Sequence, residues 1–174
     1  MRSKNEKFAR CCILPASVAC RKKLMIWGFI CSTGEGGYAV VDGRVTAASY
    51  QQLLTENLLP FLDDIPLSRA AATIFQQDNA PPHSAGATRA FLAQAVVTVT
   101  DWPALSPDLN PIENLWAIMK REVRMHHPQT LQELRKAIDT AWTRAVTPDL
   151  CRRLFASLHT RIHRVLRHAG LRLQ

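Results

Sequence analysis

Short apolar blocks separated by turn residues dominate the first part of the chain. Apolar runs at residues 24–31 and 38–41 flank the turn sequence STGEGG, a pattern that predicts a β-hairpin. After Thr46, which can cap a helix, apolar residues recur at the spacing of one helical face as far as Leu62, with Pro60 near the end. An amphipathic helix is therefore predicted to follow the hairpin.

Strand and helix patterns continue to alternate in the middle of the chain. The sequence predicts a buried strand at 72–75, a helix at about 84–94 and a β-branched strand at 95–100. The polar segment QQDNAPPHS follows the first of these strands, so Asp78 is expected at the carboxyl end of a strand. The alternation predicts an α/β fold in one domain over residues 1–174.

Three longer helices are predicted in the last third of the chain. They cover residues 111 to about 125, 131 to about 145 and 148 to about 168. Each begins with a capping signal. The signals are Asn110-Pro111, Thr130 with Glu133, and Thr147-Pro148.

Composition excludes several classes of protein. Apolar residues make up 47% of the chain and charged residues 21%, which is ordinary globular usage. No apolar run approaches the roughly 18 residues of a membrane span, so a soluble, intracellular protein without a membrane partner is expected. The five cysteines are odd in number and form no CxxC pair, which argues against a disulfide framework or a zinc site.

The net charge of +8 favours an anionic partner, and nucleic acid is the commonest one. After Asp149 the chain carries six arginines and no acidic residue. We take Arg161, Arg164 and Arg167 as the DNA-binding candidates. The alternative is that these arginines form a solvated helix face that binds nothing.

Asp78 and Glu113 are the candidate catalytic carboxylates. Glu113 occupies the third position of its predicted helix, where it could simply return a hydrogen bond to the cap. It also borders the apolar face of that helix, while Asp78 ends a strand, where ligands of open α/β sheets gather. Converging carboxylates favour Mg²⁺ or Mn²⁺, and a pair of such ions serves phosphoryl transfer.

The segments QQDNAPPHSA and WPALSPDLNPIENLW resemble the signature segments of the Tc1/mariner family of DDE transposases. Thirty-four residues separate Asp78 from Glu113, which is the Tc1-type spacing of the second and third catalytic acids. The resemblance implies an RNase H-like fold, a mixed sheet flanked by helices. It also implies that Asp78 and Glu113 bind Mg²⁺ or Mn²⁺, with no nucleotide cofactor, in proteins that cut transposon ends and join them to target DNA in the nucleus.

The chain departs from the family pattern at its N-terminal side. The family's first catalytic Asp and its helix-turn-helix region have no counterpart, so a partial catalytic domain lacking the first, central strand is expected. The segment CCILPASVA either fills that strand's place in part, which Pro15 makes awkward, or the chain is a truncated product. His83 either lies near the metal and contacts a phosphate or an acid, or caps the next helix.

Two functional hypotheses follow. In the first, the chain is part of a Tc1-like transposase, and its complete form cleaves and joins DNA with Asp78 and Glu113 binding metal. In the second, it is a non-catalytic remnant that binds DNA or itself through its cationic helices. DNA is the expected partner under both, and a homodimer is considered alongside it.

Overall fold

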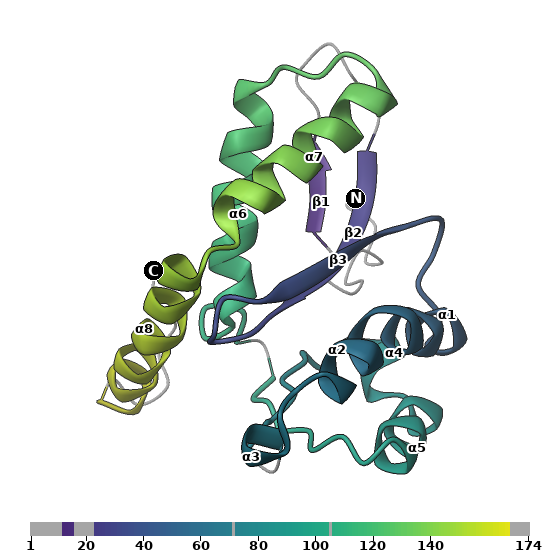
Figure 1. Ribbon diagram of the computed structural model, residues 1–174, viewed down its shortest axis with the longest axis vertical. Helices are drawn as coiled ribbons and strands as arrows, with labels where there is room; N and C mark the ends of the chain where they lie inside the picture. The colour runs from purple at the N-terminus through teal and green to yellow at the C-terminus, as the bar shows by residue number, and fades with distance from the viewer. Residues whose placement is uncertain (1–11, 16–22, 71, 105, 168–174) are drawn as a thin grey trace, which may run out of the picture. The chain divides into compact units, whose positions relative to one another are not determined.

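The computed structural model describes residues 12–15, 23–70, 72–104 and 106–167 (Figure 1). The chain divides into two compact units. We call Cys12–Val40 with Ser106–Gln174 the sheet unit, and Met1–Cys11 with Val41–Leu105 the Asp78 unit. Strands and helices both occur, and the predicted α/β class is confirmed.

The described residues of the sheet unit form three strands in the order β1-β2-β3. They are β1 (Cys12–Pro15), β2 (Lys23–Ile30) and β3 (Gly36–Val41). The strands β2 and β3 form the predicted hairpin, and its turn is closed by a hydrogen bond from the Cys31 N–H to the Glu35 carbonyl at 2.7 Å. Gly34 has a φ of 101° in this turn, a conformation that glycine adopts without strain.

Part of the segment CCILPASVA forms β1, which pairs antiparallel with β2. Cys12 lies opposite Ile26, and Pro15 lies opposite Lys23 at the last pair of the ladder. Proline is tolerated there because β1 lies at the edge of the sheet that the described residues form, and the ladder ends at Pro15.

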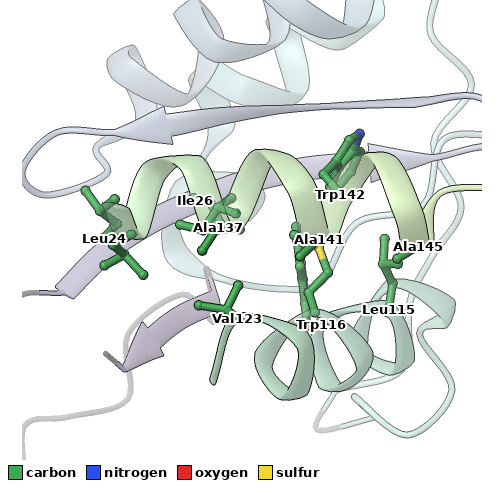
Figure 2. Close-up of a cluster of buried hydrophobic side chains, with 12 residues drawn as sticks. Leu24, Ile26, Leu115, Trp116, Val123, Ala137, Ala141, Trp142 and Ala145 are labelled. Carbon is green, nitrogen blue, oxygen red and sulfur yellow. The ribbon is translucent and has the colours of Figure 1, made fainter. Parts of the chain in front are cut away.

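Helices α6 (Pro111–Met125), α7 (Leu131–Ala145) and α8 (Pro148–Arg167) complete the sheet unit, within one residue of the predicted bounds. Figure 2 shows side chains of α6 and α7 meeting those of β2 in one apolar cluster. This core contains Leu24, Ile26, Leu115, Trp116, Met119, Val123, Leu134, Ala137, Ile138, Ala141, Trp142 and Ala145. Trp116 and Trp142 both belong to this core.

The predicted caps begin all three of these helices. The Asn110 side chain accepts from the Ile112 N–H at 3.2 Å, and Thr147 Oγ1 accepts from the Leu150 N–H at 3.2 Å. Thr130 Oγ1 accepts from the Glu133 N–H at 3.1 Å. Such caps satisfy N–H groups that the helix leaves without an internal partner.

In the Asp78 unit, the predicted helix after Thr46 forms as one stretch of three parts. These are α1 (Ala47–Leu53), a wide π turn η1 (Leu54–Leu58) and α2 (Leu59–Asp63). Pro60 has no N–H to donate and its ring crowds the preceding turn, which explains the wide turn next to it. The Leu59 N–H accordingly reaches back five residues to the Leu54 carbonyl.

Short helices and irregular segments make up the other described residues of the Asp78 unit. The helices are α3 (Leu67–Ala70), α4 (Pro81–Ser84) and α5 (Gly86–Gln94). The helix predicted at about 84–94 is therefore present, but a break at Ala85 separates it from α4. None of the helices that the structure describes combines the length and apolar character that a membrane span requires.

The strands predicted at 72–75 and 95–100 are wrong as regular strands. The described residues there form a single parallel bridge, Phe75 with Val99, with a hydrogen bond from the Phe75 N–H to the Thr98 carbonyl at 2.8 Å. Residues 95–97 close α5 instead, because the Val97 N–H bonds to the Leu92 carbonyl at 3.0 Å and Val96 takes a φ of 56°. This is the geometry of a Schellman helix end, in which Val96 takes the left-handed position after the helix.

Candidate active site

Asp78 lies three residues beyond the Phe75 bridge, in the polar segment that leads into α4. Its side chain is 38% exposed. Oδ1 accepts a hydrogen bond from the Ala80 N–H at 3.0 Å and lies 2.6 Å from Nδ1 of His83. The first contact is an Asx turn, in which the Asp side chain bonds the backbone two residues on. Asp78 is thus held from two directions.

His83 lies in α4 and is 8% exposed. Its Nε2 atom is closed to solvent and has no hydrogen-bond partner among the residues that the structure describes. A proton on Nε2 would therefore be a buried donor without an acceptor, at a cost of about 1 to 3 kcal/mol. The tautomer that fits carries its proton on Nδ1 and donates it to the Asp78 carboxylate.

Of the two interpretations of His83, contact with an acid matches the structure. The acid is Asp78. The next helix, α5, has Ala85 at its N-cap and no side-chain cap bond, so His83 does not cap it.

Tyr50 and Gln77 complete this arrangement, and sequence analysis missed both. The Tyr50 ring stacks on the His83 imidazole, with centroids 4.0 Å apart and 29° between the planes. The Tyr50 O–H donates to Oε1 of Gln77 at 2.8 Å, and Nε2 of Gln77 donates to the His83 carbonyl at 3.3 Å. In the sequence, Tyr50 is one of the apolar residues of the helix predicted after Thr46. A buried tyrosine needs a partner for its hydroxyl, which was the available signal.

Glu113 is in the first turn of α6, and its side chain is partly buried. Its N–H donates to the Asn110 carbonyl at 3.2 Å, while Asn110 caps the helix at the Ile112 N–H. Glu113 belongs to the sheet unit and Asp78 to the other unit. The convergence of the two carboxylates therefore stays a prediction.

The donor chemistry of Asp78 and Glu113 suits a hard divalent cation. Carboxylate oxygens are the ligands that Mg²⁺ and Mn²⁺ prefer, and a carboxylate can accept about four bonds, so the two bonds to Oδ1 of Asp78 are compatible with ligation. Within the described residues no group of three or more His, Cys, Asp or Glu side chains is arranged to hold a metal ion. The suitability of the site for a divalent cation therefore depends on the Asp78 and Glu113 side chains.

The three arginine candidates of α8 differ in their surroundings. Arg161 donates to the Asp108 carbonyl at 2.5 Å and to the Leu154 carbonyl at 3.3 Å. Partial burial lowers the pKa of Arg161, and the nearby Asp108 opposes that shift. Arg164 and Arg167 are exposed. Arg161 thus ties α8 to the start of α6, whereas the other two arginines face solvent.

Trp102, the first residue of the proline-rich segment, is half-buried. Its carbonyl accepts a hydrogen bond from the Asn79 side chain at 2.7 Å. Asn79 follows Asp78 directly, so this bond ties the Asp78 segment to the proline-rich segment that begins at Trp102.

Comparison with known proteins identifies the class. A family model described as DDE superfamily endonuclease matches residues 14–135, which is more than half of the chain. The chain belongs to this family. The matched residues include both Asp78 and Glu113.

Curated relatives and solved structures place the chain with the Tc1/mariner transposases. The Tc3 transposase of Caenorhabditis elegans is 32% identical over 149 residues, which cover 84% of this chain and 44% of the relative. The Tc1 transposase of the same organism is 27% identical over 144 residues, 82% of this chain and 51% of the relative. The chain spans about half the length of the curated relatives it matches.

Among solved structures, the Mos1 transposase catalytic domain with raltegravir and Mn has a TM-score of 0.76 at 27% identity, covering 89% of this chain and 80% of that one. The mariner Mos1 paired-end complex with Mg has a TM-score of 0.77 at 26% identity, covering 87% of this chain and 45% of that one. These similarities confirm the predicted RNase H-like fold and the Tc1/mariner resemblance.

Proposed function

We propose that this chain is part of the catalytic domain of a Tc1-like DNA transposase, in which Asp78 and Glu113 bind Mg²⁺ or Mn²⁺. The observation that carries the proposal is the anchored Asp78 carboxylate, which lies inside the family match together with Glu113. The complete protein would cleave the phosphodiester at transposon ends and join the freed strand to target DNA. A divalent cation supplies activation of the attacking oxygen and stabilisation of the leaving oxygen.

The residues of the chain contribute ligation and position. Asp78 offers a carboxylate whose orientation is set by Ala80 and His83. Glu113 offers a second carboxylate from the first turn of a capped helix, which fixes its backbone. The relatives whose structures contain Mg or Mn support the choice of metal.

DNA is the proposed partner, and the exposed arginines of α8 are its proposed contacts. Arg164 and Arg167 lie on a helix with no acidic residue after Asp149. Phosphate contacts of this kind make binding weaken with salt. A paired-end complex among the similar structures supports a homodimer on DNA, and DNA as substrate implies action in the nucleus. The remnant hypothesis is not favoured, because the similar proteins are transposases.

Binding of Mn²⁺ to the 174-residue chain tests the proposal. Isothermal titration should show that Asp78→Asn and Glu113→Gln each weaken Mn²⁺ binding at least about tenfold. If both carboxylates hold the same ion, the double variant should lose much less Mn²⁺ binding free energy than the sum of the losses in the two single variants.

Asp42→Asn is the matched control. Asp42 is an exposed acid in the turn after β3, and its loss should leave Mn²⁺ binding unchanged. Equal binding by Asp78→Asn and the native chain, or losses that simply add in the double variant, would remove the basis for a shared metal site.

A further inference from the structure

The Asp78 carboxylate is the end of a chain of contacts that begins in a distant part of the sequence. Tyr50, in α1, stacks on His83, in α4, and His83 bonds to Asp78. Both aromatic rings are buried, Tyr50 at 1% exposure and His83 at 8%. All of these residues lie in the Asp78 unit, so the arrangement is described within one compact part of the chain.

The contacts leave the His83 ring little freedom. Stacking on Tyr50 sets the plane of the imidazole, and the bond to Asp78 sets its rotation within that plane. Gln77 links the two ends, since it accepts from the Tyr50 hydroxyl and donates to the His83 carbonyl. A ring held in this way presents Nδ1 to Asp78 in one direction only.

A fixed donor matters because metal ligands bind through oriented lone pairs. Residues behind a ligand that hold it by hydrogen bonds tune metal affinity, and their loss typically costs about 10-fold to 100-fold in affinity. A carboxylate that is 38% exposed and not held would sample several rotamers. The Asx bond from Ala80 and the contact with His83 both go to Oδ1, so together they hold that oxygen from two sides.

We propose that Tyr50 and His83 are positioning residues for Asp78: the Tyr50 ring holds the imidazole so that its Nδ1–H orients the Asp78 carboxylate for a divalent cation. The inference rests on the proposed role of Asp78 as a metal ligand. It adds Tyr50, whose ring stacks on His83, to the determinants of the site.

Two isosteric substitutions of His83 separate positioning from packing. Asparagine places an amide N–H close to the position of Nδ1, whereas glutamine places it close to Nε2. His83→Asn should therefore retain more Mn²⁺ affinity than His83→Gln, which should lose about 10-fold to 100-fold. Because both variants remove the stacked ring, a purely structural role would affect them alike.

Substitutions of Tyr50 separate its ring from its hydroxyl. Tyr50→Phe keeps the stacking and should bind Mn²⁺ within about threefold of the native chain, while Tyr50→Leu should lose about tenfold. Tyr38→Phe is the matched control, because the Tyr38 hydroxyl also bonds to a side chain, that of Asp139, but belongs to the sheet unit. Its Mn²⁺ affinity should be unchanged.

A spectroscopic readout needs no metal. In ¹⁵N NMR of the imidazole, native His83 should carry its proton on Nδ1 and show a hydrogen bond to Asp78, and Tyr50→Leu should weaken that signature. A proton on Nε2 in the native chain would overturn the proposal whatever the binding data. Melting curves by circular dichroism check that each variant is folded.

The outcomes distinguish this inference from the proposed function. If Asp78→Asn abolishes Mn²⁺ binding while His83→Gln and Tyr50→Leu bind like the native chain, the positioning role is wrong and the metal role of Asp78 survives. If Asp78→Asn binds like the native chain, the metal role falls and the inference falls with it. Parallel losses in His83→Asn and His83→Gln would also overturn it.

Discussion

Both units of the chain bury apolar side chains, but they differ in the polar side chains that they bury. In the sheet unit, α6, α7 and β2 enclose twelve apolar side chains (Figure 2). In the Asp78 unit, the buried side chains include His83 and Thr88, which are the two buried polar residues of the described parts of the chain. Thr88 donates to the Pro82 carbonyl at 2.7 Å, while His83 bonds to Asp78.

This difference indicates that the two units have different roles. Apolar packing is non-directional and tolerates small changes in side-chain position, so it suits a scaffold. Buried polar contacts hold their partners in one orientation, and they are costly when incomplete. We therefore expect substitutions in the sheet unit to appear mainly as lost stability, and those around Asp78 to appear mainly as altered metal binding.

The largest expected effect is that of Trp116→Ala in the sheet unit. Trp116 is 4% exposed, and its ring lies 6.0 Å from that of Trp142. Its removal should lower the free energy of unfolding by about 3 to 5 kcal/mol, measured by urea denaturation. Met125→Ala in the same helix is the control, since Met125 is 61% exposed and should change stability by about 0.5 kcal/mol or less. A loss below about 1 kcal/mol for Trp116→Ala would contradict the assigned core.

Matched glycine substitutions compare the two units directly. A Cβ at Gly28 would lie 2.9 Å from the Trp116 side chain and 3.1 Å from the Gly37 carbonyl, so Gly28→Ala should cost about 1 to 3 kcal/mol. Gly86 begins α5 and has open space around its Cβ position, so Gly86→Ala should stabilise by about 0.4 to 1 kcal/mol. Thermal unfolding measures both. If both substitutions changed the melting temperature by the same amount in the same direction, packing density would not distinguish Gly28 from Gly86.

The same contrast explains which elements the sequence could predict. Helices α6 and α7 carry their start signals and their apolar face within fifteen residues each, so local pattern was sufficient. A strand depends on neighbours elsewhere in the chain. The run at 95–100 is β-branched, yet its first residues close α5 because hydrogen bonds to Leu92 and Ala93 outweigh the local preference.

The candidate site shows where sequence reasoning ends. The family motif indicated Asp78, Glu113 and His83 as candidates, because the spacing of these residues is a property of the chain itself. Tyr50 is 28 residues from Asp78, and no periodicity connects it to a polar site. Its contact with His83 exists only because α1 and α4 pack together. Charge counting likewise grouped Arg161 with its neighbours, although its guanidinium faces inward.

The next smaller effect is expected for alanine substitutions of Arg161 and Arg164, two arginines of α8. Arg161→Ala removes hydrogen bonds to the Asp108 and Leu154 carbonyls and should cost about 1 kcal/mol of stability in urea denaturation. Arg164→Ala should leave stability unchanged but lower the slope of log K against log salt for duplex DNA by about 0.9. The reverse assignment of these two effects would show that Arg161 is the DNA contact.

The smallest expected effect is the pH dependence of the cap that begins α7, compared with the cap that begins α1. The Glu133 carboxylate accepts from the Gln129 N–H at 2.7 Å, and this bond holds the pKa of Glu133 below its ordinary value of 4.5. Because the folded-state pKa is lowered, the stabilisation is present above about pH 4.5 and is lost as the pH falls through the folded-state pKa. The difference in unfolding free energy between the native chain and Glu133→Gln should therefore shrink on acidification.

The cap of α1 supplies the matched control for this pH dependence. There Ser49 occupies the position of Glu133, and its hydroxyl accepts from the Thr46 N–H at 2.8 Å. Neither Thr46 nor Ser49 ionises, so Thr46→Ala should cost about 1 kcal/mol at pH 7 and the same at pH 3. Urea denaturation of both variants at these two pH values measures the contrast. A Glu133→Gln difference that persists unchanged at pH 3 would show that the carboxylate charge contributes nothing to the start of α7.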